Sequence, residues 1–203
     1  MGGFLKLSAV VDRLSDTIGR SAYWLVLVVV LISAVNAIVR KFFDMSSNAW
    51  LEAQWYLFSI IFLCCASYTL LKNEHIRIDI VHGALSKTTR NWIDIAGHTL
   101  FLIPLCIIML VEGWPYFMLA FQMDSRGFFT DIVRLVRMAL NISTEAYNVE
   151  MSSNAGGLVR WPAKLIIVVG FALLLLQGIS ELIKRIAVMR GRIPDPHDKS
   201  GLS

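Results

Sequence analysis

The sequence carries little charge for its length. Only 17% of its 203 residues are Asp, Glu, Lys or Arg, whereas a typical soluble domain has about 25%. Hydrophobic residues make up 56% of the chain, and the mean hydropathy is +0.62. This balance excludes an ordinary soluble domain and predicts an integral membrane protein.

Residues that support catalysis or cofactor binding are also scarce. The three cysteines, Cys64, Cys65 and Cys106, lie in apolar runs and form no CxxC pair, so we expect them to pack in the core. The sequence contains no glycine-rich phosphate loop, no HExxH pair and no nucleophile elbow. We therefore predict no enzyme activity, no catalytic, substrate-binding or metal-binding residue, and no nucleic-acid partner.

Histidine is too rare inside the apolar runs for a haem site. Of the four histidines only His98 falls within such a run, and a bundle that binds haem needs paired histidines from facing helices. A membrane anchor of a redox complex is kept as an alternative, and bound haem would reveal it. A small stand-alone transporter is a second alternative, which uptake without a partner would reveal.

Long uncharged runs are what the sequence does contain. Because a helix needs about 20 apolar residues to cross a bilayer, and because the backbone must satisfy its own hydrogen bonds in lipid, these runs predict transmembrane helices. The fold class that we predict is an all-α integral membrane protein with four transmembrane helices plus amphipathic interfacial helices. A single domain, 1–190, holds the predicted spans, which cover about residues 21–40, 52–72, 93–121 and 162–184.

Amphipathic segments lie beside these spans. Apolar residues at helical spacing before residue 20 predict an amphipathic helix that leads into the first span, and we do not expect this span to be a cleaved signal peptide. We predict a cytoplasmic interfacial helix over about 75–90, and a periplasmic extended loop, 123–160, with an amphipathic helix over about 130–141. A polar cytoplasmic tail follows at 191–203.

The distribution of Lys and Arg favours cytoplasmic N- and C-termini. With that orientation the cytoplasmic segments carry twelve of these residues and the outer segments carry seven, as the positive-inside rule requires. Glu52 and Glu112 then end apolar stretches on the outer side. Four basic residues belong to the same level: Arg40, Lys41, Arg160 and Lys164. These charges could pair within the chain, contact a partner chain or couple to a proton or ion, and these interpretations stay open.

Polar residues inside the spans are few. Asn36, Gln54 and Gln177 are expected to form hydrogen bonds between helices. A transport pathway would need acidic groups near the midplane or broken helices, and Pro104 is the one proline in the middle of a span. This scarcity of polar groups and helix breaks favours an accessory subunit over a transporter.

Two blocks of the sequence resemble a known family. "NAWLEAQWYLFSIIFLCCASYTLLKNEHIRIDIV", residues 48–81, resembles the signature region of the small membrane subunit (the Q component) of TRAP transporters, the tripartite ATP-independent periplasmic transporters. "GGLVRWPAKLIIVVGFALLLLQGISELIKRI" resembles the last span of the same family. The residues that carry the resemblance are Glu52, Trp55, Tyr56, His75, Arg77, Asp79, Arg160, Trp161, Pro162 and Lys164. The 123–157 connection is longer than in many small subunits.

The resemblance implies a role in a three-part importer of the bacterial inner membrane. A periplasmic binding protein would capture an organic acid or related solute, and a large membrane subunit (the M component) would hold the substrate and sodium sites. This chain would stabilise the large subunit, and the motif residues would act in folding and subunit contact. No cofactor of its own is implied. Membrane lipid is an expected partner, with a bound phospholipid at the subunit interface as a candidate ligand.

Overall fold

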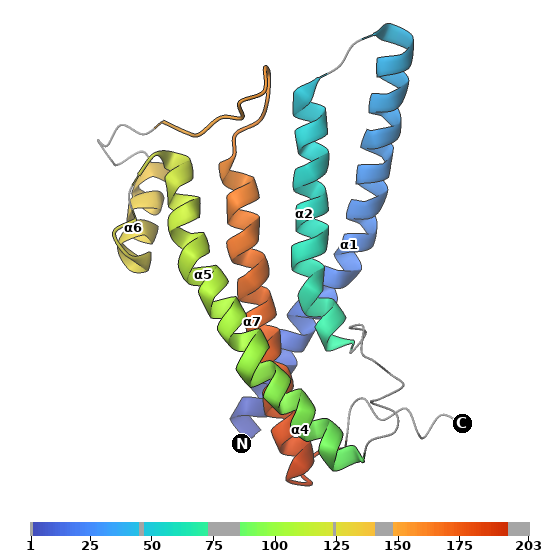
Figure 1. The fold of residues 1–203 in the computed structure, drawn as a ribbon, viewed down its shortest axis with the longest axis vertical. Coiled ribbons are helices and arrows are strands. Elements are labelled where there is room, and N and C mark those ends of the chain that lie inside the picture. Colours follow the sequence, from blue (N-terminus) through green and yellow to red (C-terminus); the bar gives the residue numbers. More distant parts are fainter. Residues whose placement is uncertain (1, 45–46, 73–85, 124, 141–147, 195–203) are drawn as a thin grey trace. The chain divides into compact units, whose positions relative to one another are not determined.

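The computed structural model describes residues 2–44, 47–72, 86–123, 125–140 and 148–194. These residues are mainly helical and contain no strand, only an isolated bridge between Met151 and Val159 (Figure 1). Four helices are long and apolar enough to cross a membrane, namely Gly2–Phe43, Asn48–Leu71, Thr88–Phe121 and Trp161–Met189. The predicted all-α class with four membrane-crossing helices is confirmed.

The elements follow one another in simple order along the chain. The first, second and fourth crossings are the single helices α1 (Gly2–Phe43), α2 (Asn48–Leu71) and α7 (Trp161–Met189). The third crossing joins α4 (Lys87–Gly97), the π-helix η1 (His98–Leu102), α5 (Ile103–Met118) and the short η2 (Leu119–Phe121). The amphipathic helix α6 (Phe128–Ala139) follows it, whereas the sequence predicts this helix over about 130–141.

The N-terminal amphipathic segment and the first predicted span form one unbroken helix, α1. No proline interrupts this stretch, so nothing in the backbone ends the helix near residue 20. Its polar side faces the rest of the chain, because Ser8 and Ser15 are buried. Its apolar side chains Leu7 and Val10 are 57% and 62% exposed. This pattern is the reverse of a soluble helix and suits an environment of lipid.

The third crossing contains a widened turn directly before Pro104. In η1 the backbone N–H of Ile103 donates to the carbonyl of His98, five residues back. A proline lacks an N–H and its ring clashes with the carbonyl four residues earlier, so a π turn here lets the helix continue past Pro104. The His98 Nδ1 atom lies 2.6 Å from the Asp94 carbonyl oxygen and donates to it.

The predicted cytoplasmic interfacial helix lies mostly outside the described residues, which resume at Ser86. The Ser86 hydroxyl accepts a hydrogen bond from the N–H of Thr89 at 3.2 Å and caps α4. Lys87–Gly97 leads directly into η1 and α5. The last residues assigned to that interfacial helix therefore belong to a helix that continues into the third crossing, which begins earlier than the predicted residue 93.

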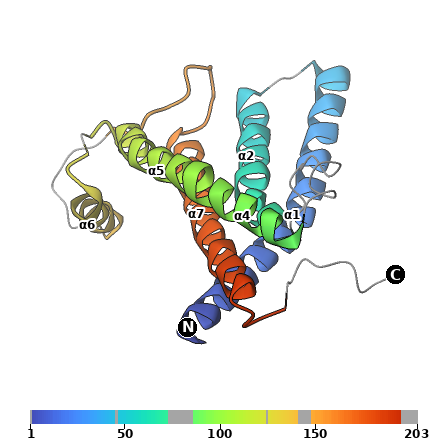
Figure 2. The same cartoon turned by 60° about the horizontal axis from the view of Figure 1, so that its bottom comes forward.

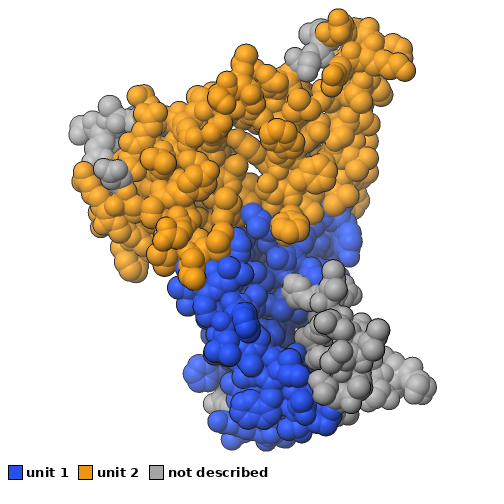
Figure 3. Space-filling view, viewed as in Figure 1, with its two compact units in different colours: residues 1–23, 63–107, 170–203 blue, residues 24–62, 108–169 orange. Residues whose placement is uncertain are grey.

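Contacts within the chain group it into two compact units (Figure 3). Unit 1 comprises Met1–Tyr23, Leu63–Ile107 and Gly170–Ser203, and unit 2 comprises Trp24–Phe62 and Ile108–Val169. Of the 19 Lys and Arg residues, unit 1 holds twelve and unit 2 holds seven. The two units thus separate the same basic residues that the sequence assigns to opposite sides of the membrane.

Glycines allow close helix contacts within unit 1. A Cβ atom on Gly19 of α1 would collide with the ring of Tyr68 on α2. A Cβ on Gly170 of α7 would lie 2.6 Å from Leu63 Cβ and 3.3 Å from the Leu63 backbone. Small residues commonly let membrane helices approach one another in this way. Side-chain volume therefore fixes how α2 packs on α1 and on α7.

In unit 2 the chain folds back after the third crossing, so that α6 lies beside α5 (Figures 1 and 2). The rings of Trp114 on α5 and Phe128 at the start of α6 have centroids 4.7 Å apart. Trp114 lies seven residues before Phe121, which ends η2, or about 10 Å back along the helix. The start of α6 is therefore level with the last apolar turns of the third crossing.

Candidate functional site

Glu52, near the start of α2, is enclosed by the segment that precedes α7. Its carboxylate accepts hydrogen bonds from the Ser152 hydroxyl, from Asn154 Nδ2 at 2.9 Å and from the Leu158 N–H at 2.6 Å. Glu52 is only 5% exposed. Three donors from one loop satisfy this carboxylate without a cation, and they fasten the loop to α2.

A glycine turn brings this loop close enough to reach Glu52. Gly156 has φ +69°, a conformation that glycine adopts at little cost, and the Gly157 N–H donates to the Asn154 carbonyl at 3.0 Å. A Cβ on Gly157 would lie 2.5 Å from Ser152 Cβ and 2.9 Å from Glu52 Oε1. The position must therefore be glycine if the carboxylate is to be surrounded.

Two further hydrogen bonds join the same loop to α2. The Tyr56 hydroxyl donates to the Val159 carbonyl at 2.9 Å, and Asn48 Nδ2 donates to the Ala155 carbonyl at 2.9 Å. Trp55, between Glu52 and Tyr56 in sequence, is 63% exposed. The aromatic pair of the motif is therefore divided, with Tyr56 holding the loop and Trp55 facing outward from the chain.

The entrance to α7 is held by Glu150. Lys164 Nζ lies 2.5 Å from Glu150 Oε2 and Arg160 Nη1 lies 3.3 Å from Glu150 Oε1. The hydrogen bond from Lys164 is the main reason that the pKa of Glu150 falls below its ordinary value; partial burial opposes the shift and Arg160 adds to it. Trp161 stacks on Phe121, with ring centroids 6.3 Å apart, and Pro162 occupies the first turn of α7.

The structure thus brings together Glu52, Tyr56, Arg160 and Lys164 around one loop, 148–160. We call this loop together with these residues the outer clamp. Trp161 and Pro162 adjoin it, and Trp55 lies on its exposed side. The three other motif residues, His75, Arg77 and Asp79, lie outside the described residues. Glu52 lies at the level of Arg160 and Lys164 in the sequence-based topology, but it does not pair with them. Glu52 accepts hydrogen bonds from neutral donors, whereas Glu150 pairs with Arg160 and Lys164.

Sequence reasoning missed Glu150, Ser152 and Asn154, because their segment reads as a polar loop of no particular structure. One signal was available, namely the glycine pair at 156 and 157, which is separated by two residues from the motif "RWPAK". Adjacent glycines at the entrance to a helix indicate a sharp turn. They do not indicate which acidic residue the turn places beside Lys164.

A second buried carboxylate, Asp131, anchors α6 to α5. It is fully buried and accepts hydrogen bonds from Trp114 Nε1 at 3.0 Å, the Ser125 hydroxyl at 2.7 Å and the Arg126 N–H at 3.0 Å. Arg134 Nη1 lies 3.6 Å from Asp131 Oδ1. Burial pushes the pKa of Asp131 upward, but these donors and the Arg134 charge outweigh it and leave the pKa below its ordinary value.

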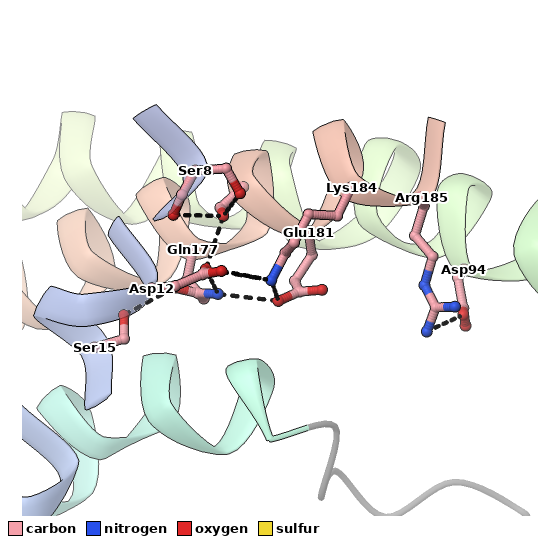
Figure 4. A network of polar contacts seen from close by, with 9 residues as sticks. Ser8, Asp12, Ser15, Asp94, Gln177, Glu181, Lys184 and Arg185 are labelled. Atoms are coloured by element: carbon pink, nitrogen blue, oxygen red, sulfur yellow. Dashed lines mark hydrogen bonds and ion pairs between the residues drawn. The ribbon is translucent and has the colours of Figure 1, made fainter. Parts of the chain in front are cut away.

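In unit 1 a third polar group, the inner network, joins α1 to α7 (Figure 4). Lys184 Nζ lies 3.0 Å from Asp12 Oδ2 and 2.5 Å from Glu181 Oε1. Gln177 Nε2 donates to Asp12 and to Glu181, each at 3.0 Å, and the Ser15 hydroxyl donates to Gln177 Oε1 at 2.8 Å. Two carboxylates thus share one ammonium and one amide between the helices.

Neighbouring contacts extend this network along α7. The Ser8 and Ser180 hydroxyls lie 2.6 Å apart, and Arg185 Nη2 lies 3.1 Å from Asp94 Oδ2 on α4 (Figure 4). Arg185 Nη1 also donates to Asn91 Oδ1 at 3.2 Å. The interhelical hydrogen bonding expected of Gln177 is confirmed, whereas the buried Gln54 Nε2 has no hydrogen-bond partner among the described residues.

The described polar groups are therefore committed mainly to holding helices and loops together. Within the described ranges, no group of three or more His, Cys, Asp or Glu side chains could hold a metal ion. Each of the three clusters pairs its carboxylates with internal donors. The chemistry that these clusters can provide is mechanical clamping of α1 to α7, of α6 to α5, and of the outer loop to α2 and α7.

Comparison with known protein families identifies the family of this chain. The model for "Tripartite ATP-independent periplasmic transporters, DctQ component" matches residues 29–144, more than half of the chain. Comparison with curated proteins and with solved structures gives no match. The matched region contains α2, its following motif and the third crossing, whereas the resemblance around α7 lies beyond it. The chain belongs to the DctQ family, the small membrane component of a tripartite transporter that also has a large membrane subunit and a binding protein.

Proposed function

We propose that this chain is a scaffold that stabilises the large membrane subunit of a sodium-coupled, binding-protein-dependent importer. The observation that carries the proposal is the division of side chains between the interior and the surface of the chain. Buried polar side chains clamp its own helices, while the long helices leave their apolar faces open. In three of the four crossings only 11% of the most apolar window is buried within the chain, which leaves apolar surface for lipid and for a partner subunit to cover.

The transport sites are assigned to the large subunit. The ion-paired carboxylates of the inner network and of Glu150 already have cationic partners, and an acidic group in such a pair is poorly suited to bind sodium. We assign the imported solute to the class of organic acids on the resemblance alone. The binding protein would deliver that solute to the large subunit without using a site on this chain.

Motif residues of the outer clamp would set the shape of the scaffold. Glu52 and Tyr56 hold the loop that leads to α7, and Arg160 and Lys164 hold it from the other side through Glu150. We assign Trp161 and Pro162 to the same structural role. Trp55 faces outward and is assigned to contact with lipid or with the large subunit, and His75, Arg77 and Asp79 to packing or subunit contact.

We further propose that both termini are cytoplasmic in the bacterial inner membrane. The unit that contains both termini carries twelve of the 19 basic residues, in accord with the positive-inside rule. The outer clamp and α6 would then lie on the periplasmic side. There α6 would lie at the membrane interface, because Phe129 and Val133 on one side of it are 82% and 56% exposed.

Reconstitution tests the scaffold role. The large subunit would be placed in liposomes with and without this chain, the binding protein and solute would be added outside, and solute uptake driven by a sodium gradient would be measured. We expect uptake to depend on this chain. If the large subunit alone transports at the full rate, the scaffold is not essential. If solute binds to this chain alone in equilibrium dialysis, the assignment of the transport sites is wrong.

A further inference from the structure

Glu112 is an ionisable residue of unit 2 that neither the outer clamp nor the α6 anchor uses. It lies on α5, inside the third candidate crossing, nine residues before the end of η2, or about 13 Å along the helix. Its side chain is exposed in the isolated chain. Ile108 and Leu119, four residues before it and seven residues after it, are apolar and are 58% and 56% exposed.

No described residue provides Glu112 with a hydrogen bond or an ion pair. One candidate cation is Lys164, whose ammonium lies 4.2 Å from the ring centroid of Tyr116, one helical turn after Glu112. That ammonium is bound to Glu150 at 2.5 Å. Arg134, the basic residue of the α6 anchor, lies against Asp131 instead. Lys164 and Arg134 are thus paired with other carboxylates.

A groove lies beside this carboxylate. It has a volume of about 670 Å³ and is formed by α5, the start of α7 and the segment that follows η2. The groove is mainly apolar in its lining residues, which include Met109, Glu112, Tyr116, Leu119, Met123 and Ile167. Such a surface offers apolar side chains around a single negative charge.

Lipid is a poor occupant of this surface. A carboxylate that faces hydrocarbon without a partner is costly, and acidic residues within membrane helices almost always face a protein partner or water. The groove is also bordered by the exposed apolar surface of α5, which continues along the crossing. Charge complementarity therefore calls for an apolar helix that carries one basic side chain.

We propose that Glu112 and this groove form the docking site for a transmembrane helix of the large subunit, whose Lys or Arg pairs with the Glu112 carboxylate. This inference rests on the proposed association of the two subunits and specifies where it occurs. The partner's apolar side chains would fill the groove beside Met109 and Tyr116. The ion pair would fix the register of the two helices at one depth in the membrane.

Site-specific photocrosslinking locates the contact without removing Glu112. A photoreactive amino acid would replace Met109 or Tyr116, on the groove side, in the chain expressed with its large subunit. The matched control is Val111, which is 61% exposed and adjacent to Glu112 but about 100° away around the helix. We expect crosslinks to the large subunit from positions 109 and 116, and at least fivefold fewer from position 111.

Substitution then tests the charge. Glu112→Gln keeps the size of the side chain and removes its charge, and should weaken binding of the large subunit at least thirtyfold, the lower end of the effect of breaking a buried charge pair. Glu112→Asp should restore most of the binding, and Val111→Leu should leave it unchanged. Binding would be measured by titrating labelled large subunit into each variant in the same detergent.

The outcomes separate this inference from the proposed function. If the wild-type subunits do not associate at all, the scaffold proposal fails. If they associate but positions 109 and 116 crosslink only to lipid or to a second copy of this chain, the docking site lies elsewhere and only the present inference is wrong. Unchanged binding by Glu112→Gln, with crosslinks intact, would contradict the ion pair.

Discussion

At the scale of single residues, the inner network is held by one lysine between two carboxylates. Lys184 is 9% exposed and contacts Asp12 and Glu181. Its ammonium offsets the repulsion between those two acids, and Gln177 Nε2 and the Ser180 hydroxyl provide further donors. The arrangement makes the contact between α1 and α7 depend on a charge balance that apolar packing alone would not provide.

Lys184→Met should therefore destabilise the protein by about 3 kcal/mol, because removing one partner of a buried pair leaves the other charges uncompensated. Thermal unfolding of the purified protein in detergent would measure the effect. A triple variant, Lys184→Met with Asp12→Asn and Glu181→Gln, removes all three charges and should lose less stability than the single variant. Equal losses in the two proteins would show that charge balance is not what the lysine provides.

Glu52 gives a second prediction at this scale. Glu52→Gln places an amide NH₂ group among donors from Ser152, Asn154 and Leu158, so the loop should detach more readily from α2. Faster hydrogen–deuterium exchange over residues 148–160 is the expected result. Trp55→Phe, at an exposed neighbour, serves as the control for the exchange measurement. Exchange, co-purification with the large subunit and uptake that all match the wild type would remove Glu52 from the clamp.

At the scale of elements, α6 and the outer loop depend on ionised carboxylates. The pKa values of Asp131 and Glu150 are both lowered in the folded protein. Their contribution to stability is therefore complete above the unfolded pKa values, about 3.9 and 4.3, and is lost as the pH falls through the folded values. Neither group should make stability change between pH 6 and pH 8.

Acidification below about pH 4 should thus release α6 from α5. Trp114 reports the event, since its indole N–H donates to Asp131, and its fluorescence emission should change as the carboxylate is protonated. Asp131→Asn should show the altered emission already at neutral pH. A Trp114→Phe variant identifies which part of the signal comes from this residue; an acid transition that persists in it unaltered would contradict the assignment.

The elements also show where sequence patterns were sufficient. Hydropathy runs located the four crossings, and the spacing of apolar residues located α6 within two residues of Phe128–Ala139. The same patterns predicted a helix that leads into the first crossing, and the structure shows the two as one helix. Periodicity identifies the apolar face of a helix, but it does not say whether that face meets protein or lipid. Leu7 and Val10, which face outward, illustrate this limit.

At the scale of the whole molecule, the proposed orientation can be tested by labelling. Single cysteines at Ser203 and at Asn154 would be introduced into a chain whose Cys64, Cys65 and Cys106 are replaced by alanine. A membrane-impermeant thiol reagent applied to intact spheroplasts should label position 154 and leave position 203 unlabelled until the membrane is permeabilised. The reverse pattern would invert the topology and with it the periplasmic location of the clamp.

The sequence by itself determined the membrane class, the number of crossings and the family, because hydropathy and short motifs are local properties of the chain. The tertiary structure decided which charged groups pair. Glu150 instead of Glu52 takes Arg160 and Lys164, and Asp12 meets Lys184 from the far end of the chain. Such pairs depend on how helices pack and how a glycine turn bends, and no local pattern encodes those distances. The same packing leaves Glu112 facing outward from the chain.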